Sequence, residues 1–200
     1  MIHKIEMDTK DKILEAAVKL FTENGFHETS MAAIAEEAGL GKGTLYWHFS
    51  SKDELFGEAV IRGGREIIKE THNFIIQEDK GQSAGDILKS FFRLNFKRIY
   101  RNKKVIGLFT NTESYFSSDV KKIFFKIHSA IASEVEEIIK LGIENGEFRS
   151  ISSRKAAIFI VGSLGAMNGI ILEDNIEDIE ELVESLYDLV LKGIQQKGDE

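Results

Sequence analysis

Three features of the sequence predict an all-α fold of about nine helices. Apolar residues recur at spacings of three and four along most of the chain, and no convincing stretch shows the period-two alternation typical of strands. None of the 200 residues is proline, which helix interiors tolerate least. Cysteine is also absent, which excludes a disulfide framework and a thiolate zinc site, so packing alone must hold the fold.

The first three predicted helices are closely spaced. The first has Ile13 and Phe21 on its apolar face and ends at Gly25, because glycine readily adopts the backbone conformation that closes a helix. Two short helices follow, over 31–38 and 40–49. Their narrow apolar faces suit close packing against the first helix.

A long fourth helix is predicted to begin near Ser51 and to run to about residue 77. Ser51 and Glu54 have the spacing of a capping box, in which the serine oxygen and the glutamate carboxylate each accept a backbone hydrogen bond. Gly63 and Gly64 lie inside this helix and predict a soft point, through which movements of the C-terminal part would shift the DNA-binding part. Close packing against a neighbouring helix is the alternative explanation of the two glycines.

Five further helices are predicted from the same apolar spacing, separated by turns that contain Gly, Asn and Ser. They cover 84–101, 104–115, 118–144, 152–173 and 176–196. No internal repeat or low-complexity tract interrupts them. The C-terminal part of the chain is therefore predicted to be a helical bundle.

The second and third helices, joined through Gly39, form a predicted helix-turn-helix. Leu45 and Phe49 take the inner face of the third helix, because they stand four residues apart. The residues left exposed or partly exposed are Lys42, Gly43, Thr44, Tyr46, Trp47 and His48. Exposed aromatic rings cost solubility, but against DNA they provide phosphate hydrogen bonds and contacts with thymine methyl groups. This face therefore predicts a helix that contacts DNA.

At these residues the sequence resembles the TetR family of bacterial transcriptional repressors. The resemblance is carried by the segments AVKLFTENGF (17–26), TSMAAIA (29–35), AGL (38–40), GTLYWHF (43–49) and KDEL (52–55). Gly41 departs from the family pattern, because members often carry serine there, and this removes one side chain able to contact a phosphate. The rest of the chain is similar to the family in length and helical pattern only.

The resemblance implies which residues contact DNA and how the chain is divided. Contacts to bases are implied for Lys42, Gly43, Thr44 and Trp47. Contacts to the DNA backbone are implied for Thr29, Ser30, Tyr46, His48 and Lys52. It further implies a three-helix helix-turn-helix DNA-binding domain over 1–53 and a helical bundle over 54–200 that binds an effector and dimerises.

The implied function is that of a ligand-responsive repressor. Such a protein binds a palindromic operator in double-stranded DNA as a homodimer and leaves it when a small hydrophobic effector binds. An activator using the same DNA contacts, a helical binding or scaffolding module and a small-molecule enzyme remain as alternatives. No catalytic group stands in a signature context and the five histidines show no ligand spacing, so no enzyme activity, metal site or cofactor is expected.

Polar residues inside apolar faces of the C-terminal half are candidate effector contacts. Asn95 falls on an arc with Leu88 and Phe92, and a buried amide without a partner costs roughly 1–3 kcal/mol. Its partner is another helix or a ligand, and the same holds for Glu113 and Asn168. The candidate effector set is Asn95, Phe96, Phe109, Glu113, Phe116, Phe124 and Asn168. A cavity-facing Glu113 favours a cationic or hydrogen-bond-donating effector, and without it a fatty acyl chain fits equally well.

Small residues within 152–173 predict a close approach of two helices. Gly162, Ala166 and Gly169 fall at i, i+4 and i+7, and the last helix offers apolar residues alongside. Pairing with the same helices of a second chain gives an isologous four-helix interface, whereas packing within one chain is the alternative. The candidate interface set is Gly162, Gly165, Ala166, Gly169, Leu182, Leu186 and Leu189.

The charge distribution supports DNA binding locally although the net charge does not. The net charge of −7 opposes contact with a polyanion, yet no acidic residue lies between Glu37 and Asp53, where Lys42 and Lys52 supply positive charge. No segment has the roughly 20 consecutive apolar residues of a membrane span, and the N-terminus lacks a signal-peptide core. A cytoplasmic protein without membrane contact is therefore expected.

Overall fold

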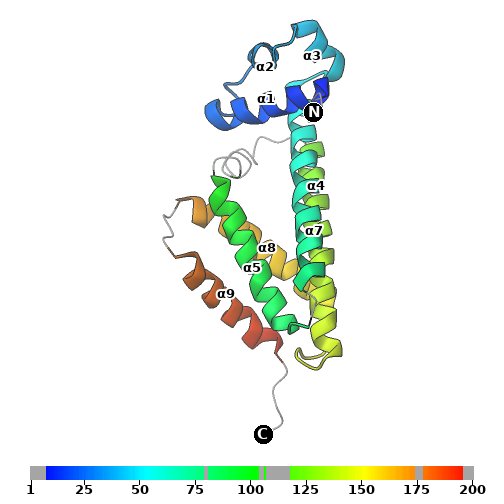
Figure 1. Cartoon of the computed structure of the whole chain (residues 1–200), viewed down its shortest axis with the longest axis vertical. Helices are drawn as coiled ribbons and strands as arrows, with labels where there is room; N and C mark the ends of the chain where they lie inside the picture. The colour runs from blue at the N-terminus through cyan, green and yellow to red at the C-terminus, as the bar shows by residue number, and fades with distance from the viewer. Residues whose placement is uncertain (1–7, 79–80, 104–105, 107–117, 174–177, 196–200) are drawn as a thin grey trace, which may run out of the picture. The chain divides into compact units, whose positions relative to one another are not determined.

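The computed structural model describes residues 8–78, 81–103, 106, 118–173 and 178–195, without the side chains of 78 and 168–173. Within them the chain forms eight helices and one isolated β-bridge between Phe148 and Gln195. In chain order (Figure 1) the helices are α1 (Thr9–Asn24), α2 (Met31–Glu37), α3 (Lys42–His48), α4 (Lys52–Glu78), α5 (Ala84–Arg101), α7 (Ser118–Glu144), α8 (Ser153–Glu173) and α9 (Ile179–Ile194). The predicted all-α fold is confirmed. The predicted helix over 104–115 falls outside the described residues except at Ile106.

The chain divides into two compact units. The N-terminal unit holds Met1–Gly63 and Lys104–Phe124, and the C-terminal unit holds Gly64–Lys103 and Phe125–Glu200. The long helices α4 and α7 each begin in the N-terminal unit and end in the C-terminal unit. The functional domain boundary predicted after residue 53 stays a prediction.

The core of the N-terminal unit forms where α1 contacts α2 and α2 contacts α3. Ile13 of α1 and Ile34 of α2 are fully buried there. Phe21, Phe26 and Phe56 form an aromatic cluster whose ring centroids lie between 5.0 and 5.5 Å apart. Aromatic pairs at such separations add about 0.5–1.5 kcal/mol each beyond the area they bury. The cluster joins α1, the turn that follows it and α4.

Turns with glycine direct the chain between these helices. Gly25 follows α1 with φ +88° and donates to the carbonyl of Phe21 at 3.0 Å, and Gly39 follows α2 with φ +68°. Residues with a side chain rarely adopt a positive φ. Ser30 caps α2, because its hydroxyl oxygen accepts a hydrogen bond from the Ala33 amide at 3.1 Å. The predicted end of the first helix at Gly25 is confirmed.

Of the two hydrogen bonds of the capping box predicted at the start of α4, the bond to the Ser51 hydroxyl is confirmed, whereas the Glu54 carboxylate accepts from Ser50 and not from the Ser51 amide. The Ser51 hydroxyl oxygen accepts from the Glu54 amide at 3.1 Å, and the Glu54 carboxylate accepts from the amide and hydroxyl of Ser50 at 2.8 and 2.5 Å. These two bonds from Ser50 hold the pKa of Glu54 below its ordinary value of 4.5. The ionised carboxylate is favourable at a helix N-terminus.

The C-terminal unit is built around α5, which lies beside α9 and also contacts α8 (Figure 1). Its buried residues include Leu88, Phe91, Phe92 and Phe96. Across the contact between α5 and α9, Lys89 pairs with Glu184 at 2.6 Å and Arg93 pairs with Glu180 at 2.8 Å. Such partly exposed pairs contribute about 0–1 kcal/mol each. The apolar face of α5 therefore supplies most of the packing energy.

Helix α9 begins later than predicted. The sequence predicts a start at residue 176, but the Asp178 carboxylate accepts from the amides of Glu180 and Glu181 at 2.8 and 3.1 Å. These bonds make Asp178 the N-cap, so α9 begins at Ile179. Residues 174–177 lie outside the described part of the chain.

Helices α4 and α7 pack closely at Gly64. A Cβ atom at this glycine would lie 2.2 Å from Cδ1 of Ile127 on α7, far inside van der Waals contact. At Gly63, by contrast, a Cβ would meet no described atom within 4 Å. Close packing therefore explains Gly64, whereas the soft-point hypothesis remains open for Gly63.

Candidate DNA interface

Helix α3 turns its apolar residues inward and its aromatic residues outward. Leu45 of α3 and Phe49, the C-cap that follows α3, are buried as predicted, with exposed fractions of 0% and 2%. Trp47 is 81% exposed and Tyr46 is 54% exposed. The two largest rings of the helix therefore face away from the core that Leu45 anchors.

The other predicted contact residues of α3 also reach the surface. Lys42, Gly43 and Thr44 are exposed, and His48 is half-buried with its ring edge-on to that of Trp47 at 4.7 Å between centroids. A Cβ at Gly43 would meet no described atom within 4 Å, so the backbone there is open to close approach. One short helix thus offers an ammonium group, a hydroxyl group and three aromatic rings.

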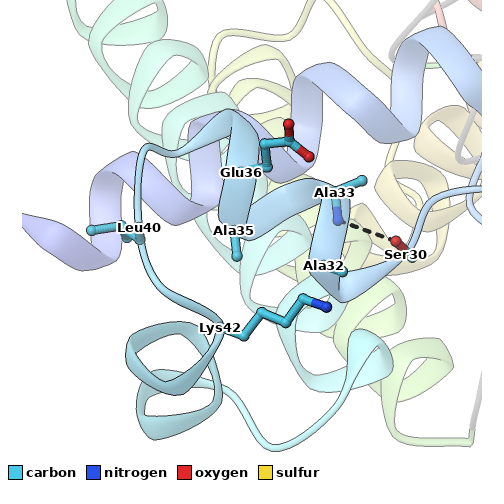
Figure 2. Close-up of a pocket in the computed structure, with 7 residues that line it drawn as sticks. All are labelled: Ser30, Ala32, Ala33, Ala35, Glu36, Leu40 and Lys42. Carbon is cyan, nitrogen blue, oxygen red and sulfur yellow. Dashed lines mark hydrogen bonds between the residues drawn. The ribbon is translucent and has the colours of Figure 1, made fainter.

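A shallow hollow of about 500 Å³ lies between α2 and α3 and brings together residues predicted separately. It is lined by three alanines of α2 with Ser30, Glu36, Leu40 and Lys42. Figure 2 shows the Lys42 side chain extending from α3 toward α2, and Ser30 at the start of α2 bonded to the Ala33 amide. The hollow exists because the alanine side chains of α2 are too small to fill it. Ser30 and Lys42 therefore share one concave surface.

Thr29 lies differently from the other predicted backbone contacts. Its side chain is 3% exposed, and its hydroxyl donates to the carbonyls of Leu20 at 3.1 Å and Gly25 at 2.7 Å. The hydroxyl is thus used to hold the turn between α1 and α2. Because its hydroxyl is engaged inside the fold, the Thr29 side chain is not part of the proposed interface.

Lys52 also points into the fold. Its ammonium donates to the carbonyls of Phe26, Thr29 and His27 at 2.7, 2.9 and 3.1 Å, and lies 4.5 Å from the centroid of the Phe26 ring. The acceptors stand 23–26 residues before Lys52 in the sequence. No local pattern reveals such a convergence, which is why sequence reasoning missed it.

One acidic side chain of α2 is neutralised within the N-terminal unit. Glu37 pairs with Lys19 of α1 at 2.7 Å, and this hydrogen bond raises the pKa of Lys19. Glu36 lines the hollow beside Lys42 without an ion pair among the described residues. The Lys19–Glu37 pair cancels one charge of each sign, so it leaves the net charge of the unit unchanged.

The predicted effector residues separate in the structure. Asn95 and Phe96 lie on α5 in the C-terminal unit, where Phe96 is buried, whereas Phe124 is half-buried and belongs to the N-terminal unit. Among the described residues, the Asn95 Nδ2 atom is buried and has no hydrogen-bond partner. Four members of the set lie outside the described side chains, namely Phe109, Glu113, Phe116 and Asn168.

Sequence reasoning missed Arg98, which follows Asn95 by one turn of α5. Its side chain is only 12% exposed, and its Nε donates to Glu70 at 3.0 Å while Nη2 donates to the buried Thr71 hydroxyl at 3.4 Å. Burial lowers the pKa of Arg98, and the charge of Glu70 opposes this in part. The signal was available, because Arg98 stands three residues after a polar residue already placed on the inner face.

The predicted dimer residues lie on α8 and α9 in varied surroundings. Gly162 and Ala166 are exposed, whereas a Cβ at Gly165 would lie 3.4 Å from His128 on α7. The remaining described members are the half-buried Leu182 and Leu186 and the exposed Leu189, and Gly169 lies outside the described side chains. Sequence reasoning missed Ile158 and Phe159, which are exposed on α8.

None of the described helices has the length and apolar composition that a membrane span requires. Within the same described residues, no three His, Asp or Glu side chains cluster in a way that could hold a metal ion.

The fold and the outer face of α3 define a helix-turn-helix DNA-binding protein with a second helical unit. A family model described as bacterial regulatory proteins, tetR family, matches residues 13–59, and one described as QacR-like protein, C-terminal region, matches residues 90–196. The second match alone covers more than half of the chain. This chain belongs to the TetR family of bacterial transcriptional regulators.

Known relatives agree with this assignment. The HTH-type transcriptional regulator YhgD of Bacillus subtilis (strain 168) is 28% identical over 146 residues, which cover 72% of this chain and 74% of that protein. The fatty acid degradation regulator FadR from Bacillus halodurans has a TM-score of 0.77 at 22% identity, covering 94% of this chain and 97% of that one. FadR from Bacillus subtilis, solved in complex with stearoyl-CoA, has a TM-score of 0.76 at 22% identity, covering 92% and 98%. At these identities the two structures establish the shared fold.

Proposed function

We propose that this protein is a homodimeric repressor that binds a palindromic operator and releases it when a small hydrophobic effector binds to the C-terminal unit. The observation that carries the proposal is the outer face of α3, where Trp47 is 81% exposed beside the exposed Lys42 and Tyr46. Such a face is unfavourable in water and gains contacts against DNA.

The dimensions of α3 suit the major groove. With its side chains an α-helix such as α3 is about 10–12 Å in diameter, and the major groove of B-DNA is about 12 Å wide. In that position Lys42 reaches a base edge, Trp47 contacts thymine methyl groups and Gly43 permits close approach of the backbone. Ser30, across the hollow from Lys42, then faces a phosphate.

A dimer supplies the second recognition helix. One short helix contacts few base pairs, whereas two related helices read half-sites about 34–36 Å apart or a multiple of that distance. Phe159 of α8 and Leu189 of α9 are each 72% exposed, and both line one hollow of about 420 Å³. Exposed apolar patches mark interfaces, so this surface of α8 and α9 is the proposed dimer contact.

A selection from randomised DNA duplexes tests DNA binding by the whole protein. We expect enrichment of an inverted repeat, because two symmetric protomers read two half-sites. An enriched sequence without two-fold symmetry contradicts the palindromic operator, and no enrichment contradicts specific DNA binding. The enriched site placed at a reporter promoter is expected to lower expression, whereas raised expression would identify an activator.

The effector is proposed to be a long-chain acyl compound. The related FadR solved with stearoyl-CoA shares this fold, which supports the choice of chemical class. On α5, Asn95 Nδ2 has no partner among the described residues, and the Arg98 guanidinium bonds to them through Nε and Nη2, so both side chains supply donors for a carbonyl or carboxylate. Phe91, Phe92 and Phe96 give the same helix an apolar face for a chain.

Three long-chain amphiphiles, two anionic and one cationic, test the effector class. Palmitate and stearoyl-CoA are expected to raise the Tm and release the enriched duplex, whereas hexadecyltrimethylammonium is not, because Asn95 and Arg98 supply donors and positive charge. Arg98→Met is expected to weaken stearoyl-CoA binding about tenfold. Tighter binding of the cationic amphiphile would contradict the proposal and favour the role for Glu113 that the sequence leaves open.

A further inference from the structure

The environment of Lys52 differs from the phosphate contact that the family resemblance implies. We propose that Lys52 is a positioning residue that fixes the start of α2 against the start of α4 and makes no contact with DNA. The proposal rests on the proposed DNA binding through α3. Its test is chosen so that the failure of either proposal can be recognised separately.

The Lys52 ammonium has no donor left for a phosphate. A lysine ammonium carries three N–H donors and no acceptor. The carbonyls of Phe26, Thr29 and His27 accept one each, at 2.7, 2.9 and 3.1 Å. The face of the Phe26 ring, 4.5 Å from Nζ, adds a cation–π contact. A phosphate oxygen would have to displace one carbonyl and would then face the other two.

The three carbonyls belong to the turn that leads into α2. Thr29 holds this turn from inside through its bonds to Leu20 and Gly25. Lys52 holds the same turn from α4. The next residue, Ser30, caps α2 and lines the hollow that it shares with Lys42. Fixing the Thr29 carbonyl therefore fixes the position from which Ser30 faces DNA.

Helix α4 provides a rigid base for this arrangement. Lys52 is the first residue of α4 and lies between Ser51, whose hydroxyl accepts from the Glu54 amide, and Glu54, whose carboxylate accepts from the Ser50 amide. A positive charge at a helix N-terminus opposes the helix dipole. The carbonyls of the preceding turn, rather than any benefit to α4, therefore account for a lysine at this position.

The salt dependence of DNA affinity separates positioning from phosphate contact. Each lysine that neutralises a phosphate contributes about −0.9 to the slope of log K against log salt concentration. Lys52→Met and Lys52→Gln are compared with wild type on the duplex enriched by selection, and Lys42→Met is the α3 control for the loss of a proposed base contact. We expect both Lys52 variants to keep the wild-type slope, whereas replacing a lysine that neutralises a phosphate would flatten it by about one.

The two Lys52 variants then differ in affinity. Lys52→Met removes every donor and is expected to weaken operator binding on the order of tenfold. Lys52→Gln has no charge but still donates from its amide, so a smaller loss is expected. If both variants flatten the slope by about one, the charge of Lys52 acts at the DNA and the proposal is overturned.

Amide hydrogen exchange of the DNA-free protein gives an independent readout. The Ala33 amide donates to Ser30, so it is expected to exchange faster in Lys52→Met than in wild type, with an intermediate rate in Lys52→Gln. Unchanged exchange at Ala33 in both variants overturns the positioning role. If wild type binds no duplex, the proposed function fails while the exchange rates still test Lys52. If Lys52→Met does not fold, Lys52→Gln decides by the same two measurements.

Discussion

Leu45 and Tyr46 are neighbours in the sequence and lie in opposite environments, and this contrast gives α3 its outer face. Leu45→Ala is expected to lower the free energy of unfolding by about 2–5 kcal/mol, because it leaves a cavity under α3. Tyr46→Ala removes an exposed ring and is expected to change the free energy of unfolding by about 0.5 kcal/mol or less. Chemical denaturation measures both variants. Equal losses would contradict the assignment of the two faces.

Asn95 is expected to cost stability in the absence of effector. Its buried Nδ2 has no partner among the described residues, and such a donor costs about 1–3 kcal/mol. Asn95→Leu is therefore expected to raise the Tm of the effector-free protein and to weaken stearoyl-CoA binding. Calorimetry with and without the effector measures the two changes. A lower Tm together with unchanged effector affinity would show that Asn95 serves packing alone.

At the residue scale, local pattern was sufficient for some side chains and not for others. The buried positions of Leu45 and Phe49 follow from their spacing on one helix. Thr29 and Lys52 could not be placed this way, because the acceptors that define them come from the turn after α1 or from α1 itself. Tertiary contacts, which no single-sequence pattern encodes, decide where these two side chains point.

Among the helices, α4 carries a pair of glycines that differ in their surroundings. Gly64→Ala is expected to destabilise the protein by about 1–3 kcal/mol, because its Cβ would overlap Ile127. Gly63→Ala has open space and is expected to stabilise α4 by about 0.5–1 kcal/mol. Thermal denaturation measures the stability of each variant relative to wild type.

The soft-point hypothesis can be tested with Gly63→Ala alone, because Gly64→Ala also perturbs packing. If Gly63 lets α4 bend, stiffening it is expected to reduce release of the enriched duplex by stearoyl-CoA. The readout is the effector concentration that releases half of the DNA. An unchanged concentration would reject the hypothesis.

The first turn of α4 is expected to weaken in acid. Hydrogen bonds from Ser50 lower the pKa of Glu54, so the ionised carboxylate stabilises the folded state. This contribution is fully present above the ordinary value of 4.5 and is lost as the pH falls through the lowered pKa. The contribution of the carboxylate is measured by comparing the free energy of unfolding of wild type and Glu54→Gln across this pH range. Identical pH profiles would show that the carboxylate contributes nothing.

Element boundaries were predictable where a side chain marks them locally. Ser51 with Glu54 and Gly25 mark the start of α4 and the end of α1 in the sequence. The start of α9 was predicted wrongly, because the acidic run before it contains several residues able to cap, and among the described residues Asp178 is the N-cap. Sequence pattern restricts the choice of cap, and hydrogen bonds decide it.

For the whole molecule, the exposed apolar surface of α8 and α9 predicts self-association. Phe159→Glu with Leu189→Glu places two charges in the proposed contact, so the double variant is expected to be monomeric and to bind the enriched duplex at least tenfold more weakly. Sedimentation velocity and fluorescence anisotropy measure the two effects. A double variant that remains dimeric would move the interface elsewhere.

The division into two units was not predictable at its observed position. Apolar periodicity continues without a break through Gly63 and Gly64, and the helical pattern of α7 is equally continuous through Phe124 and Phe125. The boundary between the two units is defined by which residues contact one another in the folded protein, and it falls inside two continuous helices. Such a boundary leaves no mark in the apolar periodicity of the sequence.

The central claim, that α3 reads DNA, is tested most directly by the affinity of Lys42→Ala/Trp47→Ala for the duplex enriched by wild type. Both side chains are exposed and outside the core, so the variant is expected to keep the wild-type Tm and oligomeric state. Its affinity for the enriched duplex is predicted to fall about a hundredfold, with a much smaller loss on unrelated DNA. Wild-type affinity in this folded double variant would contradict the account.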